Sequence, residues 1–142
     1  MTYLFFNLLN RLIPAKEVFA HCDIPCGIYT PEPAQTAALT VIRMVEKLQE
    51  ADIKDVHGIS RFTQIKEEHA QIVKEQLLIL WTDYFKEEHV AMFPSLHETF
   101  WKATKLCSKV KQEVSMDTAK ALKTAVDEIA GIFKKAEAAK KT

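Results

Sequence analysis

The sequence predicts an all-α protein, an antiparallel four-helix bundle preceded by a short loop that carries two cysteines. Two observations predict this fold class. Only three glycines occur in 142 residues, which argues against a hairpin-rich β fold and against a glycine-rich phosphate loop. From residue 34 onward, apolar side chains recur at three- and four-residue steps in four successive segments. Amphipathic helices joined by short loops bury their apolar faces well as an antiparallel bundle.

The composition fits a single globular domain and excludes several classes of partner. Nineteen basic side chains balance 19 acidic ones, so the net charge is zero at pH 7. A neutral chain has no basic surface excess for nucleic acid or an anionic membrane, and we expect neither partner. Apolar residues make up 48% and charged residues 27% of the chain, which are ordinary values for a folded domain.

Residues 1–20 differ from the rest of the chain and are predicted to form a leader. The apolar run over residues 1–13 is shorter than the roughly 20 residues needed to span a bilayer, and polar side chains interrupt it. Arg11 lies inside the run, whereas a secretory signal places its positive charge first. We therefore expect a cytoplasmic protein. The alternative to a leader is an amphipathic helix that ends at Pro14 and packs on the domain.

The first two helices are predicted from their apolar stripes. The first stripe covers residues 34–48, Pro33 suits a first helical turn, and the pattern lapses over residues 52–58. The second stripe is longer and is expected to face the interior. Its members are Phe62, Ile65, His69, Ile72, Val73, Leu77, Leu80 and Tyr84.

The third and fourth helices follow the same logic. The third is expected to begin at Pro94 and Ser95 and to continue through Val110. Residues 115–117 are a plausible N-cap for the fourth, whose apolar stripe reaches Ala136. The lysine- and alanine-rich tail over residues 134–142 is expected to fray into solvent.

The loop before the first helix contains His21, Cys22 and Cys26. A Cys-x-x-x-Cys pair can form a disulfide, bind a metal or exchange thiols. A thioredoxin-like redox motif would require a neighbouring strand pattern, and none accompanies this pair. Structural zinc normally takes four side-chain ligands, and only three are local. The spacing alone leaves open a disulfide-stapled structural protein and a non-enzymatic bundle that binds metal or senses redox state.

The fuller string HCDIPCGIY, residues 21–29, closely resembles the nickel hook of the nickel-containing superoxide dismutases, H-C-x-x-P-C-G-x-Y. The string WTDYFK at residues 81–86, followed by His89, Pro94 and His97, is similar to the same family, whose architecture is also a four-helix bundle. Every fixed position of the hook pattern is matched. The matching residues are His21, Cys22, Pro25, Cys26, Gly27 and Tyr29.

The resemblance implies a superoxide dismutase with one nickel ion per subunit, a homohexameric assembly and a protease that removes the leader before His21. In the family, the metal is held by the new N-terminal amine and imidazole at the position of His21, by the amide nitrogen and sulfur of Cys22, and by the sulfur of Cys26. Tetragonal nitrogen and sulfur coordination suits Ni(II) better than zinc. While Ala20 is attached, the His21 nitrogen is an amide and cannot act as the amine ligand.

Residues around the hook are candidates for supporting roles. The resemblance places Tyr29 on the substrate approach, where it orders water, although it can equally anchor the hook to the bundle. Asp23 is expected to orient hook amides or to lie in solvent. His69 and Ala37 occupy the places of an arginine and a glutamate that support the axial histidine in relatives. His69 is thus either a satisfied interior residue or a direct partner of His21 that tunes the metal.

The remaining candidates are expected to be structural. Tyr84 matches a family tyrosine near the metal pocket, but its helical spacing favours a place in the core. Cys107 lies on the apolar face of the third helix, which predicts a buried, inert thiol. The single lysine Lys86 is only weak evidence for a surface that attracts an anionic substrate. The histidines at predicted helix ends or loops, expected to be structural or solvated, are His57, His89 and His97.

Overall fold

The computed structural model describes residues 28–140, and over these residues it is helical with no strand. The segment before residue 28, including the predicted leader and the cysteines of the hook, lies outside the described residues. None of the helices among residues 28–140 is both long enough and apolar enough to cross a membrane. The elements are α2 (Glu32–Glu50), α3 (Val56–Ile79), a π-helical turn η1 (Leu80–Tyr84), α4 (Glu87–Met92), α5 (Leu96–Gln112) and α6 (Met116–Ala139).

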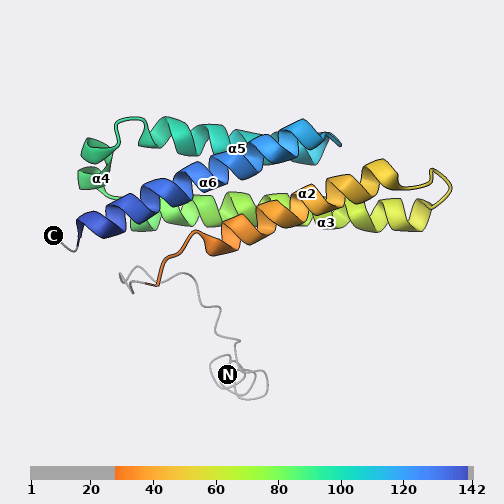
Figure 1. Cartoon of the computed structure of the whole chain (residues 1–142), viewed down its shortest axis with the longest axis horizontal. Coiled ribbons are helices and arrows are strands. Elements are labelled where there is room, and N and C mark those ends of the chain that lie inside the picture. Colours follow the sequence, from red (N-terminus) through yellow and green to blue (C-terminus); the bar gives the residue numbers. More distant parts are fainter. Residues whose placement is uncertain (1–27, 141–142) are drawn as a thin grey trace, which may run out of the picture.

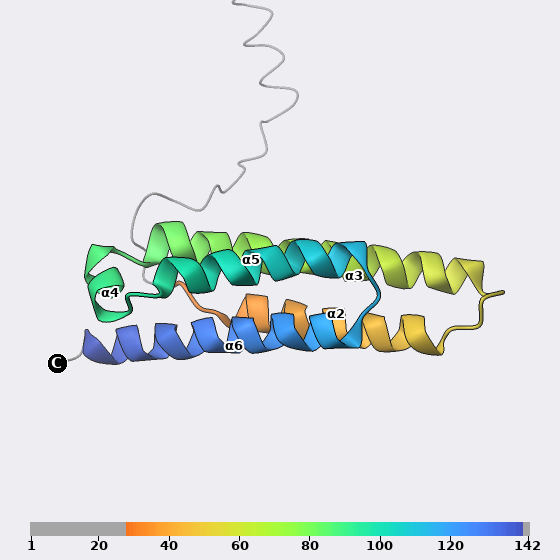
Figure 2. The ribbon, with the colours of Figure 1, turned by 90° about the horizontal axis from the view of Figure 1, so that it is seen from above.

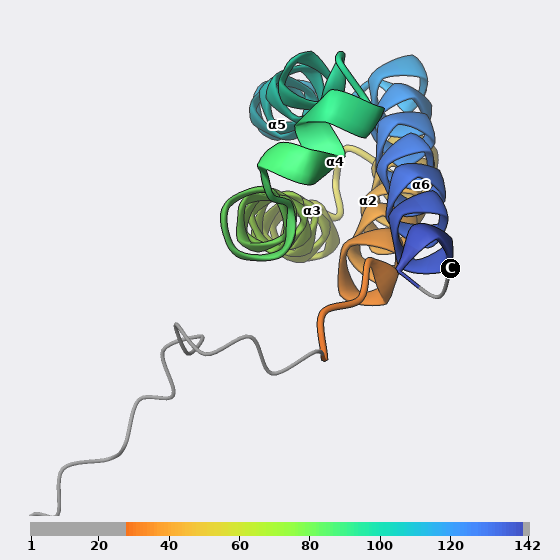
Figure 3. The same cartoon turned by 90° about the vertical axis from the view of Figure 1, so that its left-hand side faces the viewer.

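The four long helices form the predicted antiparallel four-helix bundle (Figure 1). Each packs against two others, α2 on α3, α3 on α5, α5 on α6 and α6 on α2, so that together they enclose one core. Viewed from above, α3 and α5 run side by side, and α6 runs alongside α2 (Figure 2). The short helix α4 lies across one end of the bundle (Figure 3).

The apolar stripes of α2, α5 and α6 face the interior as predicted. Fully buried members include Val41 on α2, Phe100 on α5 and Leu122 on α6. The cap predicted within residues 115–117 is confirmed, because the side chain of Ser115 caps α6 by accepting the amide hydrogen of Thr118 at 3.2 Å. The side chain of Asp55 caps α3, a cap that was not predicted from the sequence.

The stripe predicted for α3 was wrong in its first half. The buried line begins at Lys66, Ala70 and Val73, whereas Ile72 is 38% exposed and His69 is half-buried. The first half of the helix is therefore rotated about its axis relative to the prediction. Lys66 occupies the interior position although its side chain is charged.

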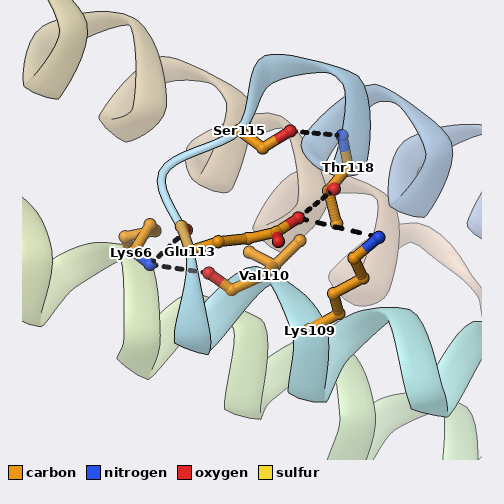
Figure 4. Close-up of polar contacts among 6 residues, drawn as sticks. All are labelled: Lys66, Lys109, Val110, Glu113, Ser115 and Thr118. Atoms are coloured by element: carbon orange, nitrogen blue, oxygen red, sulfur yellow. Dashed lines mark hydrogen bonds and ion pairs between the residues drawn. The ribbon is translucent and has the colours of Figure 1, made fainter.

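Lys66 is accommodated because its ammonium group caps the end of α5. It is 1% exposed, and Nζ donates to the carbonyl oxygens of Val110 at 2.6 Å and Glu113 at 3.0 Å (Figure 4). It also donates to the carbonyl oxygen of Lys111 at 3.1 Å. The last carbonyls of a helix have no partner within it, so this lysine replaces the water that would otherwise bind them. Burial lowers the pKa of Lys66.

Two further expectations need correction. The tail does not fray from residue 134, because α6 continues to Ala139, Ala136 is buried and Glu137 bonds to Tyr84. The connection between the second and third long helices is not a simple loop, because it contains η1 and α4. These two short elements bring Tyr84 and His89 into the core at the end of the bundle.

Candidate functional site

The first described residues lie against the bundle where α2 begins and α3 ends. A small pocket of about 100 Å³ is formed there by Ile28, Tyr29 and Thr30 together with residues of α2, α3 and η1. The ring of Tyr29 lies 6.1 Å from the ring of Tyr84, at an interplanar angle of 60°. Tyr29 is the last fixed residue of the hook pattern. The structure thus brings one predicted site residue into contact with the core.

Tyr84 is the centre of a polar and aromatic cluster at this end. It is 6% exposed, which confirms its predicted place in the core. Its hydroxyl donates to Glu137 Oε1 at 2.5 Å, and Lys140 Nζ donates to the same oxygen at 2.7 Å. The ring packs on His89 and Phe133 at centroid distances of 5.6 and 4.4 Å. Burial, followed by the bond to Glu137, raises the pKa of Tyr84.

His89 is structural and deeply buried, at 2% exposure. Its Nδ1 accepts the backbone hydrogen of Lys86 at 2.9 Å, so the neutral ring carries its hydrogen on Nε2. Burial lowers the pKa of His89 because the charged ring would lose its hydration. This histidine fixes the turn between η1 and α4, and the side chain of Lys86 is exposed.

His57 and His97 lie at the surface as predicted. His57 belongs to the first turn of α3. His97 has a structural partner, because the indole nitrogen of Trp81 donates to its Nδ1 at 2.8 Å. Trp81 in turn stacks on Phe100, with an interplanar angle of 3°.

His69 and Ala37 line the same surface groove, of about 450 Å³, between α2 and α3. His69 therefore does not face the interior as predicted. Its Nδ1 lies 2.9 Å from the carbonyl oxygen of Ile65. A carbonyl only accepts, so Nδ1 carries the hydrogen, and in the neutral ring Nε2 is left as an acceptor. The two positions at which the resemblance places an arginine and a glutamate in relatives thus line one groove.

Cys107 is a free, fully buried thiol. Burial raises its pKa to about 12, which confirms the predicted inert character. Within residues 28–140, no group of three or more His, Cys, Asp or Glu side chains is arranged to hold a metal ion. The predicted ligands His21, Cys22 and Cys26, with Asp23, lie outside the described residues.

Comparison with known proteins identifies the family. The family model for nickel-containing superoxide dismutase matches residues 16–137, a span that includes the hook and the bundle. The chain belongs to the nickel-containing superoxide dismutase family. Nickel superoxide dismutases from Streptomyces seoulensis and Streptomyces coelicolor are 42% and 41% identical to it over 128 residues, which cover 89% of this chain and 94% of each relative.

Solved structures of the family share the fold. A nickel-containing superoxide dismutase in the oxidized state superposes with a TM-score of 0.78 at 35% identity, covering 82% of this chain and 98% of that chain. A native nickel superoxide dismutase superposes with a TM-score of 0.77 at 33% identity, covering 82% and 99% of the two chains.

Two residues of the site were missed in the sequence. Glu137 and Lys140 both belong to the tail that was expected to fray, yet they hold the hydroxyl and ring of Tyr84. The spacing of residues 133, 136 and 137, which places an aromatic, a small and an acidic side chain on one helical face, is the signal that could have found them.

Proposed function

We propose that this chain disproportionates superoxide, 2 O2•− + 2 H+ → O2 + H2O2, at a nickel ion held by His21, Cys22 and Cys26. The observation that carries the proposal is the match at every fixed position of the hook pattern in residues 21–29, inside the span matched by the family model. The family relatives are named as nickel superoxide dismutases.

The donor set in this sequence fits nickel. Two thiols, one imidazole, a terminal amine and a backbone amide lie within six residues once the chain is cut before His21. Thiolate and nitrogen donors in a tetragonal arrangement favour nickel or copper over zinc. When bound, nickel supplies a Ni(III)/Ni(II) one-electron couple whose potential these anionic donors lower. The thiols must lose their protons for binding, so nickel uptake releases protons.

The residues around the hook would position substrate, water and ligand. Tyr29 would line the approach to the metal and order water there, and its packing on Tyr84 supports a fixed ring position. Asp23 would orient amide groups of the hook. His69 would accept a hydrogen bond from the imidazole of His21, and its free acceptor nitrogen in the groove beside Ala37 supports this role.

The leader over residues 1–20 would be removed by a processing protease. Cleavage before His21 converts an amide nitrogen, which is a poor ligand, into an amine. The uncut chain would then be an inactive precursor.

The assembly would be a homohexamer, and the protein would act in the cytoplasm. Several large apolar side chains in the described part of the chain are exposed, among them Ile53 at 82% and Trp101 at 55%, which supports burial against other copies. The position of Arg11 within the apolar run of the leader supports retention inside the cell. Sedimentation of the cut protein and cell fractionation test these two points.

The deciding experiment combines metal analysis, electron paramagnetic resonance and a dismutase assay on protein cut before His21. One nickel per subunit, a rhombic signal with strong axial nitrogen coupling, and activity in the cut form alone are expected. Zinc in place of nickel with no signal, or equal activity in the uncut chain, would contradict the proposal. Cys26→Ser should abolish nickel binding, whereas the matched control Cys107→Ser should retain it.

A further inference from the structure

The contact between Tyr84 and Glu137 joins the end of η1 to the end of α6. It links residues 53 positions apart in the sequence, and the hydroxyl oxygen lies 2.5 Å from the carboxylate oxygen. The same carboxylate oxygen accepts from Lys140, whose ammonium nitrogen also lies 4.4 Å from the centre of the Tyr84 ring. Tyr84 is therefore held by its hydroxyl and by one face of its ring.

The direction of this hydrogen bond is fixed by chemistry. A carboxylate has no hydrogen to donate, so the hydroxyl hydrogen of Tyr84 points at Glu137. The only groups left on the phenol oxygen are lone pairs, which accept. Charge-assisted bonds of this kind are among the stronger ones in proteins, so the hydroxyl does not rotate freely.

We propose that Glu137 is a positioning residue that makes Tyr84 a hydrogen-bond acceptor towards the segment that carries Tyr29. The inference rests on the proposed function, because Tyr29 is the last fixed residue of the hook pattern. A water molecule or hydroxyl placed between the two tyrosines would then donate to Tyr84 and be oriented by it. Without Glu137, the Tyr84 hydroxyl could donate in that direction and reverse the polarity of the contact.

The ion pair with Lys140 plays a different part. Both partners are partly exposed, at 47% for Lys140 and 40% for Glu137, so the pair adds little stability of its own. It places a cation beside the carboxylate, which offsets a negative charge close to the approach of an anionic substrate. Among residues 28–140, the charged and titratable groups seen to face Tyr84 are Glu137 and Lys140 from α6, His89 from α4 and Tyr29 before α2.

The first test detects the hydroxyl hydrogen of Tyr84 directly by nuclear magnetic resonance. The protein cut before His21 retains two tyrosines, Tyr29 and Tyr84. In the reduced, nickel-loaded form with ¹³C-labelled tyrosine, we expect one slowly exchanging, downfield hydroxyl proton that correlates with the Tyr84 ring. The signal should disappear in Tyr84→Phe and Glu137→Ala and persist in Lys140→Ala. A signal that persists in Glu137→Ala would overturn the proposal.

The second test is a double-mutant cycle on dismutase activity across pH. Glu137→Ala should lower activity by at least about threefold, at the low end of couplings between contacting residues. Glu137→Gln should restore it, because Lys140 attracts the amide oxygen to the place of the carboxylate oxygen. In the Tyr84→Phe background, Glu137→Ala should have no further effect. An equal loss in that background would show that Glu137 acts only on structure and would overturn the proposal.

Failure of the proposed function gives a different pattern. Cut, nickel-loaded wild-type protein without activity would reject the dismutase assignment, while the hydroxyl proton signal would still decide the orientation of Tyr84.

Discussion

The ammonium nitrogen of Lys66 lies 2.6 Å from the carbonyl oxygen of Val110, in the interior between α3 and α5. The same nitrogen reaches the carbonyls of Lys111 and Glu113, where the chain leaves α5 and turns towards α6. One side chain therefore satisfies three backbone acceptors at a helix end. Glu113 also accepts the hydroxyl hydrogen of Thr118, which ties this turn to the start of α6.

Replacing Lys66 with methionine keeps the length of the side chain and removes its donors. We expect a loss of about 2–4 kcal/mol in the free energy of unfolding, because buried carbonyls lose a charged donor and their desolvation is no longer compensated. Urea unfolding of the full chain, followed by circular dichroism at one fixed protein concentration, measures the change.

Lys74→Met is the matched control on the same helix. Lys74 is only partly buried, and the side-chain bond that it makes within residues 28–140, to Ser108 Oγ, is long at 3.4 Å. Its replacement should change the unfolding free energy by less than about 0.5 kcal/mol. Equal stability of the Lys66→Met protein and the wild type would contradict the capping role.

The fold could be predicted from the sequence because apolar periodicity dominates three of the four long helices. In α3 the periodicity failed at Lys66, since a pattern of apolar residues cannot show that a lysine will be buried against carbonyls 44 to 47 residues away. Aligning the stripe on Ile65 and His69 instead rotated the first half of the helix. The physical cause is a long-range hydrogen-bond partner, which local sequence does not reveal.

The candidate site also has one part that the sequence predicts and one part that it does not. The hook pattern could be recognised because its fixed residues are close together in the sequence, at residues 21–29. The support of Tyr84 could not, because it depends on Glu137 at the far end of the chain and on a π-helical turn that ends at Tyr84. The lysine- and alanine-rich composition of residues 134–142 suggested a frayed tail, whereas packing of Phe133 and Ala136 extends the helix.

Cys107 should resist alkylation in the folded protein. A pKa raised to about 12 from 9.0 lowers the thiolate fraction near neutral pH by about 1,000-fold, and burial blocks access as well. We expect no labelling of Cys107 in the native, nickel-loaded protein and rapid labelling after unfolding in urea, measured by mass spectrometry. Native labelling at the rate of a free cysteine would contradict a closed core around α5.

His89 should make stability depend on pH in mildly acidic solution. Its pKa is lowered in the folded state below the ordinary value of 6.5, so the unfolded chain binds a proton that the folded chain refuses. Stability is thus fully present above pH 6.5 and falls as pH decreases through the window below it. The slope cannot exceed about 1.4 kcal/mol per pH unit for one proton.

His89→Asn isolates this effect, because an asparagine oxygen can accept the backbone hydrogen of Lys86 without titrating. Urea unfolding of both proteins at a series of pH values should show a constant difference above pH 6.5. Below it, the wild type should lose stability relative to the variant. Parallel curves over the whole range would show that His89 is not the group responsible.

His69 should tune the metal centre without binding the metal. His69→Leu removes the acceptor nitrogen from the groove beside Ala37 and retains a side chain of similar bulk. We expect nickel content to stay at one per subunit, because the proposed ligands His21, Cys22 and Cys26 are unchanged. The axial nitrogen coupling in the paramagnetic resonance spectrum should change, and activity should fall about 10–100-fold, as for other partners of metal-binding histidines.

His69→Gln, which restores an acceptor, should recover part of the nitrogen coupling and part of the activity. His57→Leu, the same substitution at an exposed position of the same helix, should alter neither. An unchanged spectrum and activity in His69→Leu would mean that the ring only caps the carbonyl of Ile65, and that His21 finds its support elsewhere.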